Sequence, residues 1–267
     1  MLTYRQIAKA LNQLGLDCPA IAHASLSSFG DEVRGSAETV VGALLGAFSG
    51  LMMPTFTYKT MLIPEVGPEN NGLEYGRSRD ANLTAEFFSP QLTADAMMGA
   101  VPEALRQHPH ARRSMHPMLS FTGINVDQAL AAQTIADPLA PIGVLAESQA
   151  YVLLVGVNHT VNTSIHYAEK LAGRKQFLRW ALTPAGVVAC PGWPGTSSGF
   201  QQITLHIEAI TRRVQVGQSE IQAIPLVELI NTAKALIEAD PLALLPDESE
   251  GDLRARAVRE DVAIRLG

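Results

Sequence analysis

The sequence is poor in cysteine, in charge and in long apolar runs. Its 267 residues include two cysteines, Cys18 and Cys190, which are too few for a disulfide framework or a cysteine-based zinc site. No stretch approaches the roughly 20 apolar residues of a membrane span. Segment 1–16 scatters charges among apolar residues, as an amphipathic helix does and a signal peptide does not. We therefore expect a cytoplasmic protein with reduced thiols and no membrane partner.

Charged residues are scarce and neither sign dominates strongly. They make up 17% of the chain, below the roughly 25% usual for soluble domains, whereas 47% of the residues are hydrophobic. This composition excludes intrinsic disorder, which requires low hydrophobicity and high net charge. The net charge of −6 provides no basic field, so we expect no nucleic-acid partner. A cationic ligand suits this charge better.

Apolar runs of strand length alternate with segments of helical period, which predicts an α/β protein with a parallel sheet. The predicted strands are 20–24, a strand that together with its exit loop covers 51–58, and 151–157. The predicted helices are 4–14, one that begins at Ser36 and ends before Gly50, 93–107, 127–136, one that begins near 163, 226–239, and a solvated terminal helix within 247–265. Residues 59–92 form a long connection rich in proline, glycine and acidic residues, and such a connection in a compact domain is usually functional or disordered.

The segment 153–169 is the most informative. A buried strand leads into a polar loop, and Asn162 or Thr163 can cap the helix that follows. In open α/β sheets, sites form outside the carboxyl ends of strands. His166 falls in the first helical turn, where the helix dipole disfavours the imidazolium form, and Glu169 lies three residues on, on the same face. His166 is therefore a candidate general base.

A simpler interpretation of the same segment stays open. In it, His166 bonds a loop carbonyl, and Glu169 is solvated or paired with Lys170 or Arg174. A metal site built on histidine would need ligands from distant segments, and we expect no metal.

Two further clusters could bind a phosphate. His23 ends the first strand, and the hydroxyls that follow it can cradle a phosphate ahead of the next helix, although serine-rich turns are also ordinary loop chemistry. Downstream, two adjacent arginines beside a serine match the geometry of a phosphate, with a solvated basic turn as the alternative. The serines of the first cluster are Ser25, Ser27 and Ser28, and the second cluster comprises Arg112, Arg113, Ser114 and His116. Neither GxGxxG nor GxxxxGK[ST] occurs.

These segments, taken together and in order, resemble the aminoglycoside 3-N-acetyltransferase family, whose members modify antibiotics with acetyl-CoA. The resemblance extends from the first helix to about residue 179 and is carried by five motifs, at 23–30, 35–44, 53–57, 112–121 and 162–169. It implies a three-layer α/β/α fold with a mostly parallel central sheet and a smaller strand-rich C-terminal part. It also implies one two-lobed domain over 1–267, with the CoA-binding and catalytic motifs within 20–180 and the acceptor side within 181–267.

The resemblance also implies roles for individual residues. The catalytic group comprises His166, Glu169 and His23. The acetyl-CoA contacts fall on Ser25, Ser27, Ser28, Arg34, Gly35, Arg112, Arg113, Ser114 and His116. The acceptor contacts fall on Tyr58, Glu65, Glu74, Asp80, Asn162 and Thr163, with the acidic residues of 59–80 either attracting a cationic amine or simply solvated.

The implied reaction is direct transfer of an acetyl group from acetyl-CoA to the 3-amino group of a 2-deoxystreptamine aminoglycoside, with histidine as general base. Beyond residue 179 the segment 190–200 departs from the resistance enzymes. Two alternatives to aminoglycoside acetylation therefore remain, an N-acyltransferase for another small amine and a catalytically silent CoA-binding protein. A homodimer is also left open.

Overall fold

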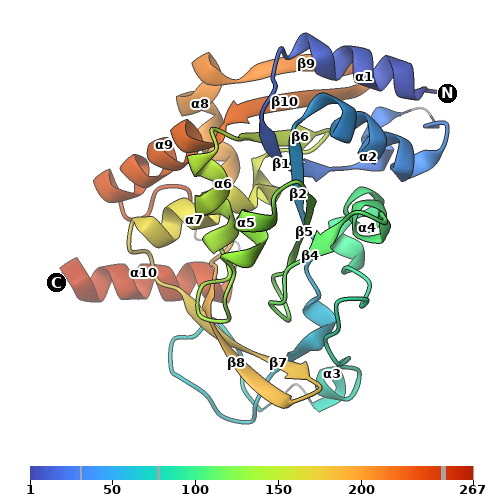
Figure 1. The fold of residues 1–267 in the computed structure, drawn as a ribbon. Helices are drawn as coiled ribbons and strands as arrows, with labels where there is room; N and C mark the ends of the chain where they lie inside the picture. The colour runs from blue at the N-terminus through green and yellow to red at the C-terminus, as the bar shows by residue number, and fades with distance from the viewer. Residues whose placement is uncertain (31, 77–78, 248–250, 267) are drawn as a thin grey trace.

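A seven-stranded sheet between helices dominates the computed structural model, which describes residues 1–30, 32–76, 79–247 and 251–266 (Figure 1). The strands of this sheet, in spatial order, are β4 (Arg112–Arg113), β5 (Phe121–Ile124), β2 (Gly50–Pro54), β1 (Pro19–Ala24), β6 (Tyr151–Val155), β10 (Ser219–Pro225) and β9 (Arg212–Val216). The neighbours β2, β1 and β6 are parallel, and every other adjacent pair is antiparallel. Five of these seven strands consequently run in one direction, and the predicted α/β fold class is confirmed.

Successive side chains of the central strands point alternately to the two faces of the sheet, and this divides the hydrophobic core into two clusters. Ile21 of β1 and Val152 of β6 belong to one hydrophobic cluster, whereas Ala22 of β1 and Leu153 of β6 belong to the other. Successive side chains of a strand point to opposite faces, so strands covered on both faces are apolar throughout. This explains why both strands appear in the sequence as continuous apolar runs.

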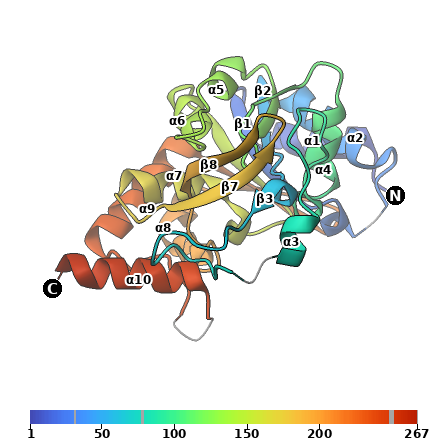
Figure 2. The ribbon, with the colours of Figure 1, turned by 90° about the horizontal axis from the view of Figure 1, so that it is seen from below.

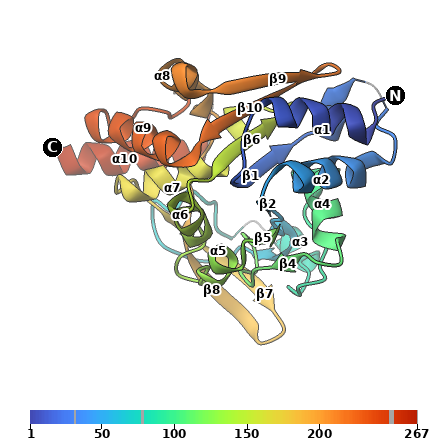
Figure 3. The same cartoon turned by 45° about the horizontal axis from the view of Figure 1, so that its top comes forward.

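Each face of the sheet is covered by its own helices (Figure 3). One layer consists of α1 (Tyr4–Gln13), α2 (Ser36–Ala47) and α4 (Ala100–Gln107). The opposite layer consists of α5 (Asp127–Ala131), α6 (Ala140–Glu147), α7 (Thr163–Leu171), α8 (Thr204–Ile207) and α9 (Leu226–Ala239). In the described ranges, no helix has the length and hydropathy needed to cross a bilayer.

A second, antiparallel sheet lies beside the large one, with β7 and β8 as a long hairpin (Figure 2). Its strands are β3 (Met61–Leu62), β7 (Phe177–Thr183) and β8 (Gly186–Trp193), and the short α3 (Arg79–Leu83) and the terminal α10 (Leu253–Leu266) lie nearby. The strand-rich part of the chain therefore serves two sheets, because β9 and β10 extend the large sheet from β6. The division of one domain into a half within 20–180 and a half within 181–267 stays a prediction.

Two predicted helices differ in extent from the observed ones, and a third differs in its burial. The helix predicted over 93–107 begins at Ala100, because a 3₁₀ turn at Ala96–Met98 and Gly99, with a φ of 86°, precede it. The helix predicted over 127–136 ends at Ala131. The terminal helix is not simply solvated, since α10 buries Ala255, Ala257, Val258 and Val262. The prediction for residues 248–250 lies outside the described residues.

Candidate active site

A cavity of about 1350 Å³ opens at the carboxyl ends of the parallel strands and extends to the small sheet. His23 and Ala24 line it from the end of β1, Pro54 from the end of β2, and Val157 from the loop after β6. Ligand sites of open α/β sheets form in this position. The topology thus brings together the polar turns that the sequence places after successive strands.

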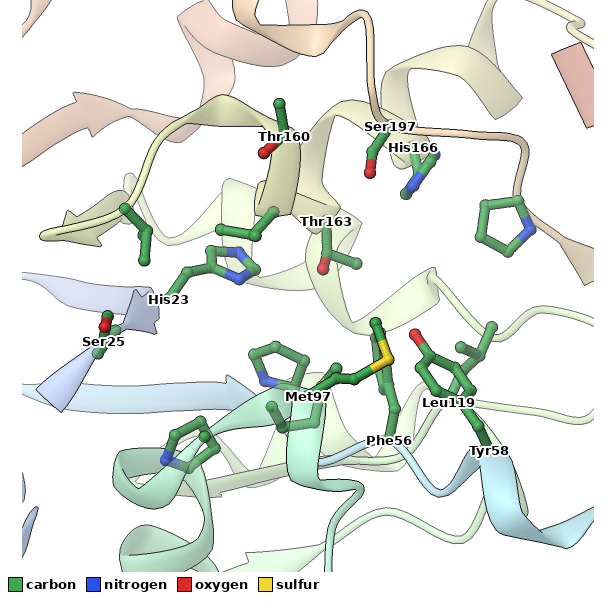
Figure 4. A pocket seen from close by; sticks show the side chains of 18 of the residues that line it. His23, Ser25, Phe56, Tyr58, Met97, Leu119, Thr160, Thr163, His166 and Ser197 are labelled. Carbon is green, nitrogen blue, oxygen red and sulfur yellow. The ribbon is translucent and has the colours of Figure 1, made fainter. Parts of the chain in front are cut away.

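His166 enters the cavity from the first turns of α7 (Figure 4). The helix begins where Asn162 Oδ1 accepts a 3.2 Å hydrogen bond from the backbone N–H of Ser164. His166 Nδ1 lies 2.6 Å from Glu169 Oε2, one helical turn away. Because the carboxylate of Glu169 accepts a hydrogen bond from Nδ1–H, the tautomer is fixed and Nε2 is left as the proton-accepting atom.

The carboxylate behind His166 is fully buried and held from two sides. Glu169 Oε1 accepts a 2.7 Å hydrogen bond from Arg174 Nη1, and both side chains are almost completely inaccessible. Arg174 in turn donates from Nη2 to the carbonyls of Pro241, at 2.8 Å, and Ala243, at 2.6 Å. The sequence offered the His166–Glu169 and Glu169–Arg174 pairs as alternatives, and the structure contains both.

The turn after β1 contributes hydroxyls to the opposite side of the cavity. Ser25 and Ser27 line it, together with Gly35 at the N-terminus of α2. Ser28 does not line the cavity, because its hydroxyl donates to the carbonyl of Ser25 at 2.7 Å and lies 2.9 Å from the hydroxyl of Ser219. Arg34 is also outside the lining.

The segment 112–116 does not reach the cavity. Arg112 is exposed and lies 3.0 Å from Asp127, and Arg113 donates to the backbone carbonyls of Thr55, Leu92 and Pro90. Ser114 and His116 are buried, and both accept backbone N–H groups of residues 118–121. These side chains hold the backbone around β5, so the structure gives no support to a phosphate clamp there.

The acceptor-side predictions divide in a similar way. Tyr58 and Thr163 line the cavity, but Glu65, Glu74 and Asp80 do not and lie at the surface of the long connection. Asn162 is buried as the cap of α7. Among the described residues, Glu32 is the only carboxylate in the lining. Likewise, no group of three or more His, Cys, Asp or Glu side chains in that part of the chain is arranged to hold a metal ion.

Ser197 is a lining residue that the sequence analysis missed, and Figure 4 shows it beside His166. A signal existed, since Gly195–Gly199 matches the G-x-S-x-G consensus of hydrolase nucleophiles. The structural context differs from that motif. The segment is a loop and turn after β8, and no hydrogen bond joins Ser197 to His166 in the described part of the chain. The matching pattern therefore lacks the nucleophile–base contact of an active serine.

Three buried histidines are neutral at physiological pH. Burial lowers the pKa of His23 to about 3, with a further contribution from His159. Burial likewise lowers the pKa of His116 to about 4 and that of His159 to about 4, the latter assisted by Arg213. His23 Nε2 has no hydrogen-bond partner among the described residues, so His23 presents a neutral ring to the cavity.

These histidines predict an acid-labile fold. In the unfolded chain these three histidines take up protons near pH 6.5, whereas in the folded chain they stay neutral down to about pH 3–4. Between these pH values the unfolded state therefore binds more protons than the folded state. The free energy of unfolding therefore keeps its full value above about pH 6.5. Below that pH it decreases by up to about 1.4 kcal/mol per pH unit for each of the three histidines. Urea unfolding at pH 7, 6 and 5 measures the slope of the free energy of unfolding against pH.

We expect His116→Gln to reduce this slope and His206→Gln, at an exposed position, to leave it unchanged. A slope equal in His116→Gln and wild type would contradict the assignment.

Comparison with known proteins agrees with the motifs. The chain matches the aminoglycoside 3-N-acetyltransferase family over residues 21–238. It is 33% identical over 187 residues to aminoglycoside N(3)-acetyltransferase IX of Micromonospora chalcea, a match that covers 64% of this chain and 63% of that protein. The chain thus spans less than two thirds of the length of that relative.

Solved structures share the fold. The apoenzyme of aminoglycoside acetyltransferase AAC(3)-IVa superposes with a TM-score of 0.77 at 21% identity, over 97% of each chain. A binary complex of AAC-IIIb with CoASH superposes with a TM-score of 0.70 at 19% identity, over 89% of this chain and 96% of that one. The family match over most of the sequence and these superpositions lead to one conclusion, that the chain belongs to the aminoglycoside 3-N-acetyltransferase family.

Proposed function

We propose that this chain is an acetyl-CoA-dependent N-acetyltransferase in which His166 is the general base. The observation that carries the proposal is the 2.6 Å contact between His166 Nδ1 and Glu169 Oε2, which directs Nε2 at a large cavity beside the parallel strands. Membership of the acetyltransferase family gives this geometry its reaction class.

The reaction needs one proton acceptor and no covalent enzyme intermediate. The acceptor amine attacks the thioester carbonyl, and a C–N bond forms as the amine proton moves to His166 Nε2. The C–S bond then breaks, CoA leaves as the thiolate, and the proton of His166 passes to the sulfur. The carboxylate of Glu169 stabilises the imidazolium formed on the way, and holding both substrates in one cavity supplies much of the rate.

The end of the cavity near β1 fits acetyl-CoA as a co-substrate. The hydroxyls of Ser25 and Ser27 lie there beside Gly35, which precedes the 12-residue helix α2. Unpaired N–H groups and the positive dipole end make a helix N-terminus suited to anions such as phosphate. A related structure is described as a binary complex with CoASH, which supports the same co-substrate.

Two acceptor classes follow from different observations. The names of the relatives support an aminoglycoside, acetylated on the 3-amino group of 2-deoxystreptamine, with the acidic residues of 59–80 gathering the polycation at the surface. The lining supports another amine, since a polycation would meet a single carboxylate, Glu32, in the described part of the cavity wall. A catalytically silent CoA-binding protein is disfavoured by the intact pair of His166 and Glu169.

A thiol-release assay with acetyl-CoA over a panel of amines tests the function. We expect at least one amine to be acetylated. The amount of CoA released should then equal the amount of acetylated amine, which mass spectrometry measures. Absence of product with every amine, despite calorimetric binding of acetyl-CoA, would reject the enzyme in favour of the silent binding protein. Release of CoA without acetylated amine would indicate hydrolysis and reject amine transfer.

A further inference from the structure

The cavity wall beyond His166 carries two arginines. Arg179, from β7, and Arg254, from α10, both line the cavity, and Trp193 and Tyr58 line it with them. The guanidinium of Arg179 lies 5.6 Å from the ring centroid of Trp193, whose ring is 5.6 Å from that of Tyr58. Figure 4 shows Tyr58 on the side away from Ser25. The cationic end is therefore opposite the hydroxyl-rich end that fits acetyl-CoA.

Arg179 is a buried cation without a carboxylate partner in the described part of the chain. Arg179 is 2% exposed, and its Nη1 donates hydrogen bonds to the carbonyls of Leu178, at 2.8 Å, and Asn71, at 3.0 Å. Burial, followed by the charge of Arg254, lowers its pKa to about 10, so the group stays charged at neutral pH. A buried charge that lacks an opposite charge is costly, and a second cation nearby raises that cost.

Arg254 reaches the wall next to the catalytic pair. Its Nη1 donates to the carbonyl of Gly195 at 3.1 Å, and a Cβ placed on Gly195 would lie 3.9 Å from Glu169 Oε1. The side chain passes over Gly72, where a Cβ would come within 2.7 Å of its Cγ. Asp252 Oδ1 lies 3.8 Å from Nε of Arg254 and accepts a 2.8 Å hydrogen bond from the backbone N–H of Arg254. Asp252 thus caps α10 and offsets the guanidinium charge only in part.

We propose that the acceptor amine also carries an anionic oxygen group, a carboxylate or a phosphonate, which Arg254 binds directly and Arg179 attracts from behind. This inference rests on the proposed function. Guanidinium donors match the oxygens of both groups, and such charge-assisted bonds are about twice as strong as neutral ones. An anion held at Arg254 would place an amine a few bonds away beside His166. A polycationic aminoglycoside would instead meet two like charges.

Matched amines test the inference. A neutral alkylamine, an ω-amino carboxylate and an ω-aminoalkyl phosphonate of equal chain length are compared with a 2-deoxystreptamine aminoglycoside in the thiol-release assay. We expect kcat/KM for one of the anionic amines to exceed that of the neutral amine by about 10- to 100-fold. The better anionic amine identifies the group. A neutral amine or an aminoglycoside as the best acceptor would overturn the inference and leave the acetyltransferase proposal intact.

Variants of Arg254 attribute the preference to the guanidinium. We expect Arg254→Gln to reduce the anionic-to-neutral ratio of kcat/KM to about 1 and Arg254→Lys to retain part of it. Arg256→Gln is the matched control, because Arg256 lies on the same helix, is exposed and pairs with Glu260. A ratio unchanged in Arg254→Gln would overturn the assignment.

Calorimetry makes the result independent of turnover. The same amines are titrated into the complex of the wild-type protein with CoA, and the anionic amine should bind at least 10-fold more tightly than the neutral one. Equal affinities would reject the anion site even if every amine proves inert, in which case the proposed function fails separately. If Arg254→Gln weakens the binding of acetyl-CoA rather than that of the amine, the anion that Arg254 recognises is CoA itself. That outcome would also overturn the inference.

Discussion

The variant His166→Ala should lower kcat by roughly two to four orders of magnitude, the usual contribution of a positioned general base. Without the imidazole, the amine proton loses the acceptor that we propose for it, and Glu169 cannot replace it because its carboxylate is fully buried and bonded to Arg174. Steady-state CoA release with the best acceptor from the amine panel measures the loss.

Binding of acetyl-CoA separates a catalytic loss from a structural one. We expect calorimetry to give the same dissociation constant for acetyl-CoA in wild type and His166→Ala, since the hydroxyl-rich end of the cavity is untouched. His206→Ala, at an exposed position of α8 outside the lining, is the matched control and should keep full activity. A kcat for His166→Ala within a factor of a few of wild type would exclude His166 as the base.

The contact between His166 and Glu169 was predictable because its geometry is local. A strand, a polar loop and a capped helix place His166 and Glu169 on one helical face whatever the rest of the fold does. The same holds for Ser25 and Ser27, which follow the end of a buried strand and line the cavity, but not for Ser28, whose hydroxyl bonds to the carbonyl of Ser25 instead. The fold class was predictable for a similar reason, since continuous apolar runs mark strands that are covered on both faces.

The destinations of the arginines were not predictable. Arg113 looks in the sequence like a phosphate ligand, yet its guanidinium is used by carbonyls of residues about 20 to 60 positions away. Arg179 and Arg254 look like unrelated charges, and only the approach of α10 to the small sheet brings both to one wall. A sequence shows which residues carry donors, whereas the packing of distant segments decides which acceptors those donors meet.

The buried ion pair between Glu169 and Arg174 should contribute strongly to the stability of the fold. We expect Glu169→Ala to lower the free energy of unfolding by about 3–5 kcal/mol, the cost of leaving one partner of a buried ion pair uncompensated. Arg174 would keep its bonds to the carbonyls of Pro241 and Ala243 but would have lost its only carboxylate within the described residues. Urea unfolding at pH 7.5, where His23, His116 and His159 are neutral, measures the change.

A double-mutant cycle tests whether the loss comes from the unpaired charge. Glu169→Ala/Arg174→Ala removes both charges, so its loss should be smaller than the sum of the two single losses by at least about 1 kcal/mol. Glu260→Ala breaks an exposed pair with Arg256 and should cost no more than about 0.5 kcal/mol. Additive losses, or a cost for Glu169→Ala as small as that of Glu260→Ala, would mean that the pair orients His166 without stabilising the fold. In that case Glu169→Ala would still lower kcat, because the Nδ1 proton of His166 would lose the acceptor that fixes its tautomer.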